Sequence, residues 1–315
     1  MLEVKVVRFL ALVLPCLFVI ASSDDHAFAA PPLSAYGELP GFEMAALSPS
    51  GDKVALIGTL GKERKLIVLD KDRKLLTAMA VADAKVRWLQ WAGEQTVVLM
   101  KSDTAALGIG FTADKAELFS AIVVPLSGGE AWAVFAGKSR VTGGVRGFYG
   151  LAERGGKWFG YFGGMTLEGS LPGVAQLMSS DPVLYEVDLQ TRAIKQVAPR
   201  ISEQEDDREW LVGSDGKVAA TLDISASRGT WLIRNREGRK IAGGANALGR
   251  VDFIGFGPAQ DSVIYSDEDV ASGVVRWFDL PLAGGEGREI LENVVISRGL
   301  LDPRSKSLIG YALDG

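Results

Sequence analysis

The stretch Ala46-Leu47-Ser48-Pro49-Ser50-Gly51-Asp52-Lys53-Val54-Ala55-Leu56 predicts a β-strand, a tight turn and a second β-strand. Pro49 fixes its own φ, Gly51 permits a positive φ, and short polar side chains bond nearby backbone groups, so the middle of the stretch favours a turn. The valine and leucine residues on either side favour extended backbone. The pattern matters because it recurs along the chain, and repeats indicate architecture.

The repeat has a nearly regular spacing. Consecutive second strands lie 43, 121, 45 and 45 residues apart, and they begin near Val54, Val97, Val218, Val263 and Leu308. The longest gap has room for two units, and we expect the hidden unit around Tyr149–Phe159. Four short strands in each unit of about 40–50 residues are typical of a β-propeller blade. The sequence therefore predicts an all-β fold, a β-propeller with about five complete four-stranded blades and a partial sixth that begins at Ser297.

A second repeat supports the first. Val124–Glu130 resembles Leu280–Glu286, and we expect both turns to lie between the third and fourth strands of their blades. Related turns are predicted at Leu69–Arg73, Val187–Arg192 and Ile233–Arg239. Two segments depart from this β pattern, because Thr112–Ser120 and Pro172–Ser179 have the composition of one or two helical turns.

The N-terminus has the pattern of a secretory leader. Lys5 and Arg8 precede an apolar run over Phe9–Ala21, and Ala27–Ala29 forms an A-x-A cleavage site. We expect a signal peptide over 1–29 with cleavage after Ala29, an extended Pro-rich segment over 30–41 and a propeller domain over 42–315. The expected location is periplasmic or secreted, with membrane contact only if the leader stays uncleaved.

The amino-acid composition excludes several kinds of partner and of catalytic or metal site. The 315-residue chain has a net charge of −5, with acids and bases interspersed, so nothing indicates a nucleic-acid partner. Its one cysteine, Cys16, and its one histidine, His26, both lie in the predicted leader. A processed chain would have no disulfide, no His-containing triad and no Cys or His zinc ligand. We expect no cofactor and no metal.

Three segments carry a family resemblance. The chain resembles exported bacterial members of the prolyl oligopeptidase (S9-type) family of serine peptidases over Pro31–Gly41, Ala46–Ala55 and Leu184–Leu189. The last of these segments reads Leu-Tyr-Glu-Val-Asp-Leu. The resemblance covers the chain from about Pro31 to Gly315. It implies a propeller that filters or orients peptides for an α/β-hydrolase domain, which carries a Ser-Asp-His triad with the nucleophile in a G-x-S-x-G motif.

The chain resembles only the propeller of that family. It contains no G-x-S-x-G, and Ser225–Gly229, the nearest match, lacks the first glycine. No catalytic residue is therefore carried over, and we expect the chain alone to be inactive. The expected function is a non-catalytic propeller that binds or gates peptides when paired with a separate hydrolase domain. The alternative is a stand-alone periplasmic TolB-like propeller that binds a protein or peptide. A third hypothesis is an enzyme that uses carboxylates, such as a glycosidase. That chemistry needs two acids about 5–10 Å apart.

An acidic run supplies the candidate peptide-binding residues. Residues 203–209 read Glu-Gln-Glu-Asp-Asp-Arg-Glu. Such a run usually forms a solvated loop between blades. The functional interpretation is that its carboxylates pair with a peptide α-amino group, as propeller glutamates do in the dipeptidyl members of the family. The candidates are Glu203, Glu205, Asp206 and Asp207.

Four weaker patterns have structural explanations. Gly108–Ala113 matches G-x-G-x-x-A, but a β-rich repeat favours an irregular loop over a dinucleotide site. Asp267–Asp269 is oxygen-rich like a calcium loop, although a hairpin tip explains it better. The seven tryptophans recur at strand positions, which indicates packing between blades. Three arginines near strand starts are candidates to face a central channel: Arg154, Arg208 and Arg250.

Overall fold

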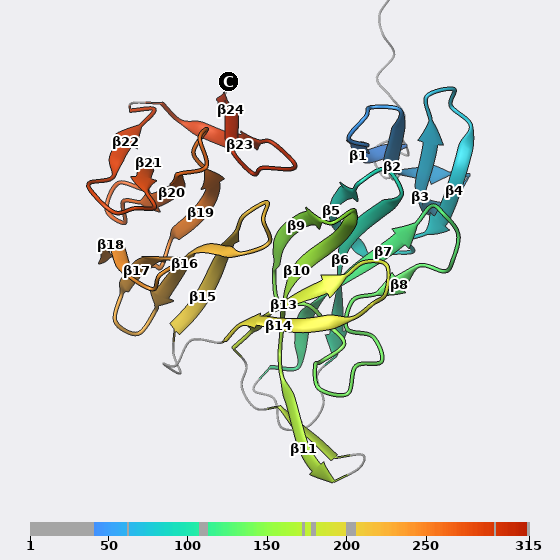
Figure 1. Ribbon diagram of the computed structural model, residues 1–315, viewed down its shortest axis with the longest axis horizontal. Coiled ribbons are helices and arrows are strands. Elements are labelled where there is room, and N and C mark those ends of the chain that lie inside the picture. Colours follow the sequence, from blue (N-terminus) through green and yellow to red (C-terminus); the bar gives the residue numbers. More distant parts are fainter. Residues whose placement is uncertain are drawn as a thin grey trace, which may run out of the picture. The chain divides into compact units, whose positions relative to one another are not determined.

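A computed structural model describes residues 41–61, 63–106, 113–171, 174–177, 181–199, 206–292 and 294–313. The predicted leader lies outside these residues, as does the Pro-rich segment apart from Gly41. All regular secondary structure in the described part is β (Figure 1). It contains no helix with the length and hydropathy needed to cross a membrane.

Five sheets have four strands each, hydrogen-bonded in chain order. The first two are β1 (Phe42–Leu47), β2 (Lys53–Leu60), β3 (Glu63–Asp70), β4 (Leu75–Ala80), and β5 (Lys85–Ala92), β6 (Thr96–Ala106), β7 (Lys115–Pro125), β8 (Trp132–Ala133). The third is β9 (Phe148–Arg154), β10 (Lys157–Gly164), β13 (Val183–Asp188), β14 (Ile194–Ala198). The fourth and fifth are β15 (Asp206–Val212), β16 (Val218–Ser225), β17 (Thr230–Asn235), β18 (Lys240–Ala245), and β19 (Val251–Phe256), β20 (Ser262–Glu268), β21 (Val275–Pro281), β22 (Arg288–Ile290).

Two further sheets have two strands each. Hairpin β11 (Leu167–Leu171) and β12 (Val174–Leu177) is inserted into the third sheet between β10 and β13. The last sheet pairs β23 (Ile296–Leu301) with β24 (Leu308–Leu313). Repeated four-stranded antiparallel meanders are the blades of a β-propeller, and the described residues hold five of them with a partial sixth. The predicted fold class is confirmed.

The repeat also predicted the hairpins correctly. The hidden unit around Tyr149–Phe159 is the hairpin of β9 and β10. The turns after Val124, Leu280, Leu69, Val187 and Ile233 each connect the third and fourth strands of a sheet. The two helical expectations are wrong where they can be compared, because Lys115–Ser120 lies in β7 and Val174–Leu177 lies in β12. In both segments, pairing with a neighbouring strand replaces the weak local helix preference.

Neighbouring sheets share their hydrophobic cores. Four clusters of buried side chains each join one sheet to the next along the chain, from the first and second sheets to the fourth and fifth. Buried tryptophans take part in three of them, so the predicted packing role of tryptophan between blades is confirmed. A blade cannot cover both of its faces by itself, which is why the cores lie between sheets.

The first turns of adjacent sheets are also connected. Ser50 donates its backbone N–H to Glu94 Oε1 at 2.7 Å, and the Lys53 ammonium lies 3.1 Å from Glu94 Oε2. Gly93 approaches Trp158 of the third sheet so closely that an added Cβ would lie 2.5 Å from the indole nitrogen. The turn sequence that recurs along the chain therefore has a tertiary role as well as a local one.

Lys306 fixes the β23–β24 turn to three other sheets. Its ammonium donates to Val212 O at 2.8 Å and also to Tyr149 O, while its carbonyl accepts from Phe256 N at 2.9 Å. Burial lowers the pKa of Lys306 to about 8. Gly150 has φ +111°, and a Cβ at that position would overlap the Lys306 side chain. The turn is thus a packed part of the fold.

Candidate functional site

The larger of two described cavities lies at the first turn of the chain. We call it the first-turn cavity, and its volume is about 780 Å³. The end of β1, the turn that follows it, β5, Trp158 and the β23–β24 turn contribute its walls. The cavity therefore draws on four sheets whose residues are far apart in sequence.

Apolar side chains dominate the open part of this cavity. Leu47 is 68% exposed, and the other exposed apolar lining residues are Ala45, Pro49, Leu301 and Pro303. Leu47 faces outward because β1 alternates between exposed and partly buried positions. Exposed apolar side chains gathered around a cavity are typical of a surface that binds an apolar ligand.

Two hydrogen bonds hold the walls together. Trp91 Nε1 donates to Ala46 O at 2.8 Å, which joins β5 to β1. Gln90 Nε2 donates to Pro303 O at 3.2 Å, which joins β5 to the β23–β24 turn. These bonds fix the positions of the apolar residues before any ligand arrives.

The turn that forms the far wall is ordered by one carboxylate. Asp302 Oδ1 accepts hydrogen bonds from Ser305 N at 2.6 Å and from Arg304 N at 2.9 Å. The bond from the Ser305 backbone is the main reason that the pKa of Asp302 lies below its usual value. Asp302 is therefore used for local structure, whereas its neighbours Leu301 and Pro303 are free to contact a ligand.

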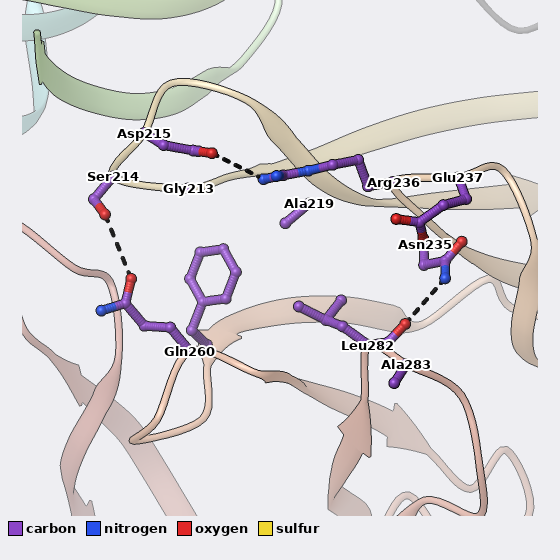
Figure 2. Close-up of a pocket in the computed structure, with 11 residues that line it drawn as sticks. Gly213, Ser214, Asp215, Ala219, Asn235, Arg236, Glu237, Gln260, Leu282 and Ala283 are labelled. Carbon is purple, nitrogen blue, oxygen red and sulfur yellow. Dashed lines mark hydrogen bonds and ion pairs between the residues drawn. The ribbon is translucent and has the colours of Figure 1, made fainter.

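A smaller cavity of about 380 Å³ lies between the fourth and fifth sheets, and we call it the inter-sheet cavity (Figure 2). Its polar side chains mostly satisfy one another. Arg236 pairs with Asp215 at 3.1 Å, and Asn235 Nδ2 donates to Leu282 O at 3.0 Å. Because these groups already have partners, the inter-sheet cavity is the weaker candidate for a binding site.

The acidic candidates separate into two groups. Glu203 and Glu205 lie outside the described residues, and Asp206 is the first residue of β15. Asp207 lies on β15 and is exposed. The expectation of a solvated loop is therefore wrong for residues 206–209, which pair with β16 over the whole of β15. The cross-strand hydrogen bonds of β16 outweigh the low strand preference of acidic residues.

Sequence reasoning did not single out Glu209, which lies two residues after Asp207. Burial raises the pKa of Glu209 to about 7, with further contributions from the negative charges of Asp252 and Asp207 and an opposing hydrogen bond from the Phe253 backbone. Among the described residues, no lysine or arginine forms an ion pair with any of these three acids. They line neither cavity. A glycosidase needs its two acids beside a substrate site, and these three acids do not meet that requirement at either cavity.

The three arginines expected at a channel are used within their own sheets. Arg154 pairs with Glu186, and Arg250 pairs with Glu268. Arg208 makes two bonds to the buried Asp223, at 2.6 and 2.8 Å. The pairs of Arg208 and Arg250 connect neighbouring strands, whereas the pair of Arg154 on β9 and Glu186 on β13 spans β10. All three arginines therefore have partners within the protein.

The remaining sequence candidates have local explanations. Asp267 and Glu268 end β20, and Asp269 caps the next turn by accepting from Ser272 N at 2.7 Å, as expected for a hairpin tip. No group of three acidic, histidine or cysteine side chains in the described part is arranged to hold a metal ion. Apart from Ala113, the Gly108–Ala113 segment lies outside the described residues.

Comparisons with known proteins find solved structures that match at low sequence identity. No protein-family model and no curated protein matches the chain. The propeller domain of the trilobed protease from Pyrococcus furiosus is 14% identical, with a TM-score of 0.42, over 79% of this chain and 67% of that one. TolB from Acinetobacter baumannii is 14% identical, with a TM-score of 0.38, over 78% and 56%.

An oligogalacturonate lyase solved in complex with manganese is 12% identical, with a TM-score of 0.48, over 80% of this chain and 66% of that one. The chain spans 58 to 63% of the length of several other solved structures that it matches. Similarity at this level transfers no activity, so the assignment to the propellers rests on the sheet topology above.

Proposed function

We propose that this chain is a non-catalytic β-propeller of an exported serine peptidase related to the prolyl oligopeptidases. In this proposal it binds or gates a peptide substrate for a hydrolase domain, in the periplasm or outside the cell. The family resemblance of Pro31–Gly41 and Ala46–Ala55 supports the family. The observation that carries the binding role is the first-turn cavity with its exposed apolar lining.

The chemistry of the cavity favours an extended apolar peptide. Its volume of about 780 Å³ lies within the range of about 300–1,000 Å³ that is usual for ligand pockets. Leu47 and Leu301 offer aliphatic contacts, and Pro49 and Pro303 add rigid apolar surface. A peptide with aliphatic and proline side chains would cover these groups and remove them from water, which is the main source of affinity at such a site.

The acidic candidates have a subordinate place in the proposal. Asp207 is exposed and carries negative charge near Glu209 and Asp252. Unpaired carboxylates raise the local concentration of cations, so they would attract the α-amino end of a peptide to this part of the protein. We extend the same proposed role to Glu203, Glu205 and Asp206.

Peptide titration tests the binding role. Tryptophan fluorescence would follow the binding of short peptides made of aliphatic residues and proline, because Trp91 and Trp158 line the cavity. We expect Leu47→Asp to weaken binding at least tenfold, because it places a charge against the apolar ligand. Leu60→Asp is the matched control, since Leu60 lies in the same sheet, is similarly exposed and does not line the cavity.

The proposal fails if Leu47→Asp and Leu60→Asp bind these peptides equally well. Binding of a folded periplasmic protein but of no peptide would instead favour the alternative, a stand-alone TolB-like propeller. Turnover of aminoacyl- or prolyl-nitroanilides by the pure protein would contradict the non-catalytic assignment.

A further inference from the structure

The far wall of the first-turn cavity is charged, whereas its other walls are not. Among the described residues that line the cavity, Asp302 and Arg304 are the two with ionisable side chains, and both belong to the β23–β24 turn. The remaining lining residues are apolar or neutral, and the exposed ones include Leu47, Pro49 and Leu301. A few polar groups in a mainly apolar pocket usually fix the orientation of a ligand. The charges of this turn therefore indicate how a ligand lies in the cavity.

The negative charge of Asp302 is directed into its own turn. Asp302 Oδ1 accepts from Ser305 N at 2.6 Å, from Arg304 N at 2.9 Å and from Ser305 Oγ at 2.9 Å. Hydrogen bonds to an ionised carboxylate stabilise it and offset part of its charge. The Arg304 guanidinium is therefore the main charge that the cavity offers to a ligand.

This guanidinium has no partner in the part of the chain that the structure describes. Arg304 is exposed, and the hydrogen bond that it donates within that part comes from its backbone N–H. By contrast, Arg154, Arg208 and Arg236 each pair with a carboxylate. Arginine presents its N–H donors as a planar fork that matches the geometry of a carboxylate. Arg304 thus places an anion-binding group beside an apolar cavity.

The neutral hydrogen-bond donors of the cavity point to the same kind of ligand. Trp91 Nε1 donates to Ala46 O and Gln90 Nε2 donates to Pro303 O, so both are occupied. Within the described residues, the indole N–H of Trp158 has no acceptor, and it adds a second unpaired donor to the lining. Unpaired donors favour a ligand that supplies acceptors. The cavity therefore suits an apolar molecule that carries an anionic acceptor.

We propose that the first-turn cavity binds the C-terminal end of an apolar peptide, whose α-carboxylate pairs with the Arg304 guanidinium. This inference rests on the proposed function and specifies its substrate, a peptide with a free C-terminus. A peptide of aliphatic and proline residues has no other anion that could meet the arginine. A carboxylate accepts two parallel N–H bonds from arginine, which fixes its direction as well as adding affinity. Leu47 and Leu301 then contact the side chains of the last residues of the peptide.

The turn that carries Arg304 is held in place without a ligand. Pro303 O accepts from Gln90 Nε2 at 3.2 Å, which connects the turn to β5. Lys306 donates to Val212 O at 2.8 Å, which connects the turn to β15. A preformed support lowers the entropic cost of binding, because little besides the arginine side chain has to be ordered when the carboxylate arrives.

Two N-acetylated pentapeptides of leucine and proline are the probes, one with a free C-terminal carboxylate and the other with a C-terminal amide. Their side chains are identical, so the difference in Kd isolates the carboxylate. Titration calorimetry with the full chain measures both values. We expect the free acid to bind about tenfold more tightly, because the amide loses a charge-assisted bidentate pair. The preference should shrink at high salt, since ion pairs near the surface are screened.

Variants of the protein locate the carboxylate site. Arg304→Gln should abolish the preference for the free acid and leave the affinity for the amide unchanged, and it keeps the backbone bond to Asp302. Arg304→Lys should retain part of the preference, because lysine keeps the charge but not the fork. Arg298→Gln is the matched control, since Arg298 is exposed on β23 of the same sheet and lines neither cavity. It removes the same charge and should leave the preference intact.

Four outcomes would overturn the inference. Equal affinities for the free acid and the amide would overturn it and leave the proposed function standing, whereas failure of both probes to bind would overturn the two together. Equal effects of Arg304→Gln and Arg298→Gln would assign the preference to the general charge of the surface. An amidated peptide ending in glutamate that binds as tightly as the free acid would assign Arg304 to an acidic side chain in place of a C-terminus.

Discussion

The pKa of Glu209 depends on the groups that surround it. Glu209 and Asp207 are two residues apart on β15, so their side chains lie on the same side of the strand. Asp252 lies on β19 of the neighbouring sheet. Burial and the two like charges disfavour its ionised form, so its pKa rises from 4.5 to about 7. Between these values the native state binds more protons than the unfolded state. The free energy of unfolding therefore falls as the pH rises from 4.5 to 7.

Glu209→Gln removes this titration while keeping the size of the side chain. We expect the variant to gain stability relative to the wild type as the pH rises through this window, by at most about 3 kcal/mol. The gain will be smaller to the extent that water screens the partly exposed carboxylate. Urea unfolding below pH 4.5 and above pH 7, followed by tryptophan fluorescence, measures it. Asp252→Asn should reduce the effect in a chain that retains Glu209, and parallel pH profiles of wild type and Glu209→Gln would contradict the account.

Lys306 illustrates what the sequence could not predict at this scale. Asp302-Pro303-Arg304-Ser305-Lys306 has the composition of an exposed turn, and lysine usually lies in water. Its burial depends on the carbonyls of Tyr149 and Val212, which lie 157 and 94 residues away in the sequence. No local pattern encodes such partners.

At the scale of elements, the first turns give a direct test of close packing. Gly93 has φ +64°, and a Cβ there would lie 2.5 Å from Trp158 Nε1. Gly51, in the equivalent turn of the first sheet, has φ +78° and nothing within 4 Å of an added Cβ. We expect Gly51→Ala to lower the free energy of unfolding by about 1 kcal/mol through backbone strain alone. Gly93→Ala should cost about 2–4 kcal/mol, because the clash adds to that strain.

Chemical unfolding of both variants measures the difference. Trp158 also lines the first-turn cavity, so displacement of its indole should appear as a change in the fluorescence of native Gly93→Ala. Equal losses in the two variants would mean that Trp158 moves aside without cost, and that contact between the second and third sheets contributes little.

The elements themselves were largely predictable because turn chemistry and alternation are local. Residues such as Pro49 and Gly51 specify the turn that they occupy, and the second strands begin within about two residues of the expected positions. Two kinds of element were not predictable. β15 begins with acidic residues whose strand character comes from pairing with β16, and the inserted hairpin of β11 and β12 breaks the spacing of the repeat.

At the scale of the molecule, the repeat predicted the fold but not the cavities. The spacing between repeated turns can be measured in the sequence alone, and that spacing was enough to predict the blades. The first-turn cavity needs Leu47, Gln90, Trp158 and Leu301 to meet, and their meeting depends on how sheets pack. The sequence contained one relevant signal, the partial sixth blade, whose turn provides one wall of the cavity.

The cores between sheets differ in size, and this predicts how the molecule unfolds. Among the residues that the structure describes, the cluster between the third and fourth sheets has five buried members, whereas the other three clusters have ten to fifteen. Trp210 is the largest side chain in that small cluster and packs edge-on against Tyr149, with ring centroids 5.0 Å apart. In a repeat protein, stability is approximately a sum of units and nearest-neighbour contacts, so the smallest core is the place where cooperativity breaks first.

Trp210→Ala should therefore do more than lower stability by the ~3–5 kcal/mol usual for such a truncation. We expect it to separate unfolding into two steps, one for the sheets from β1 to β14 and one for those from β15 to β24. Hydrogen exchange measured along a urea series would show the two groups of amides losing protection at different concentrations. Trp231→Ala is the control, because Trp231 belongs to a cluster of eleven buried residues and should lower stability without splitting the transition. A single transition in Trp210→Ala, with all amides exposed together, would mean that contacts elsewhere, such as those of Lys306 with Tyr149 and Val212, keep the sheets cooperative when the small core is lost.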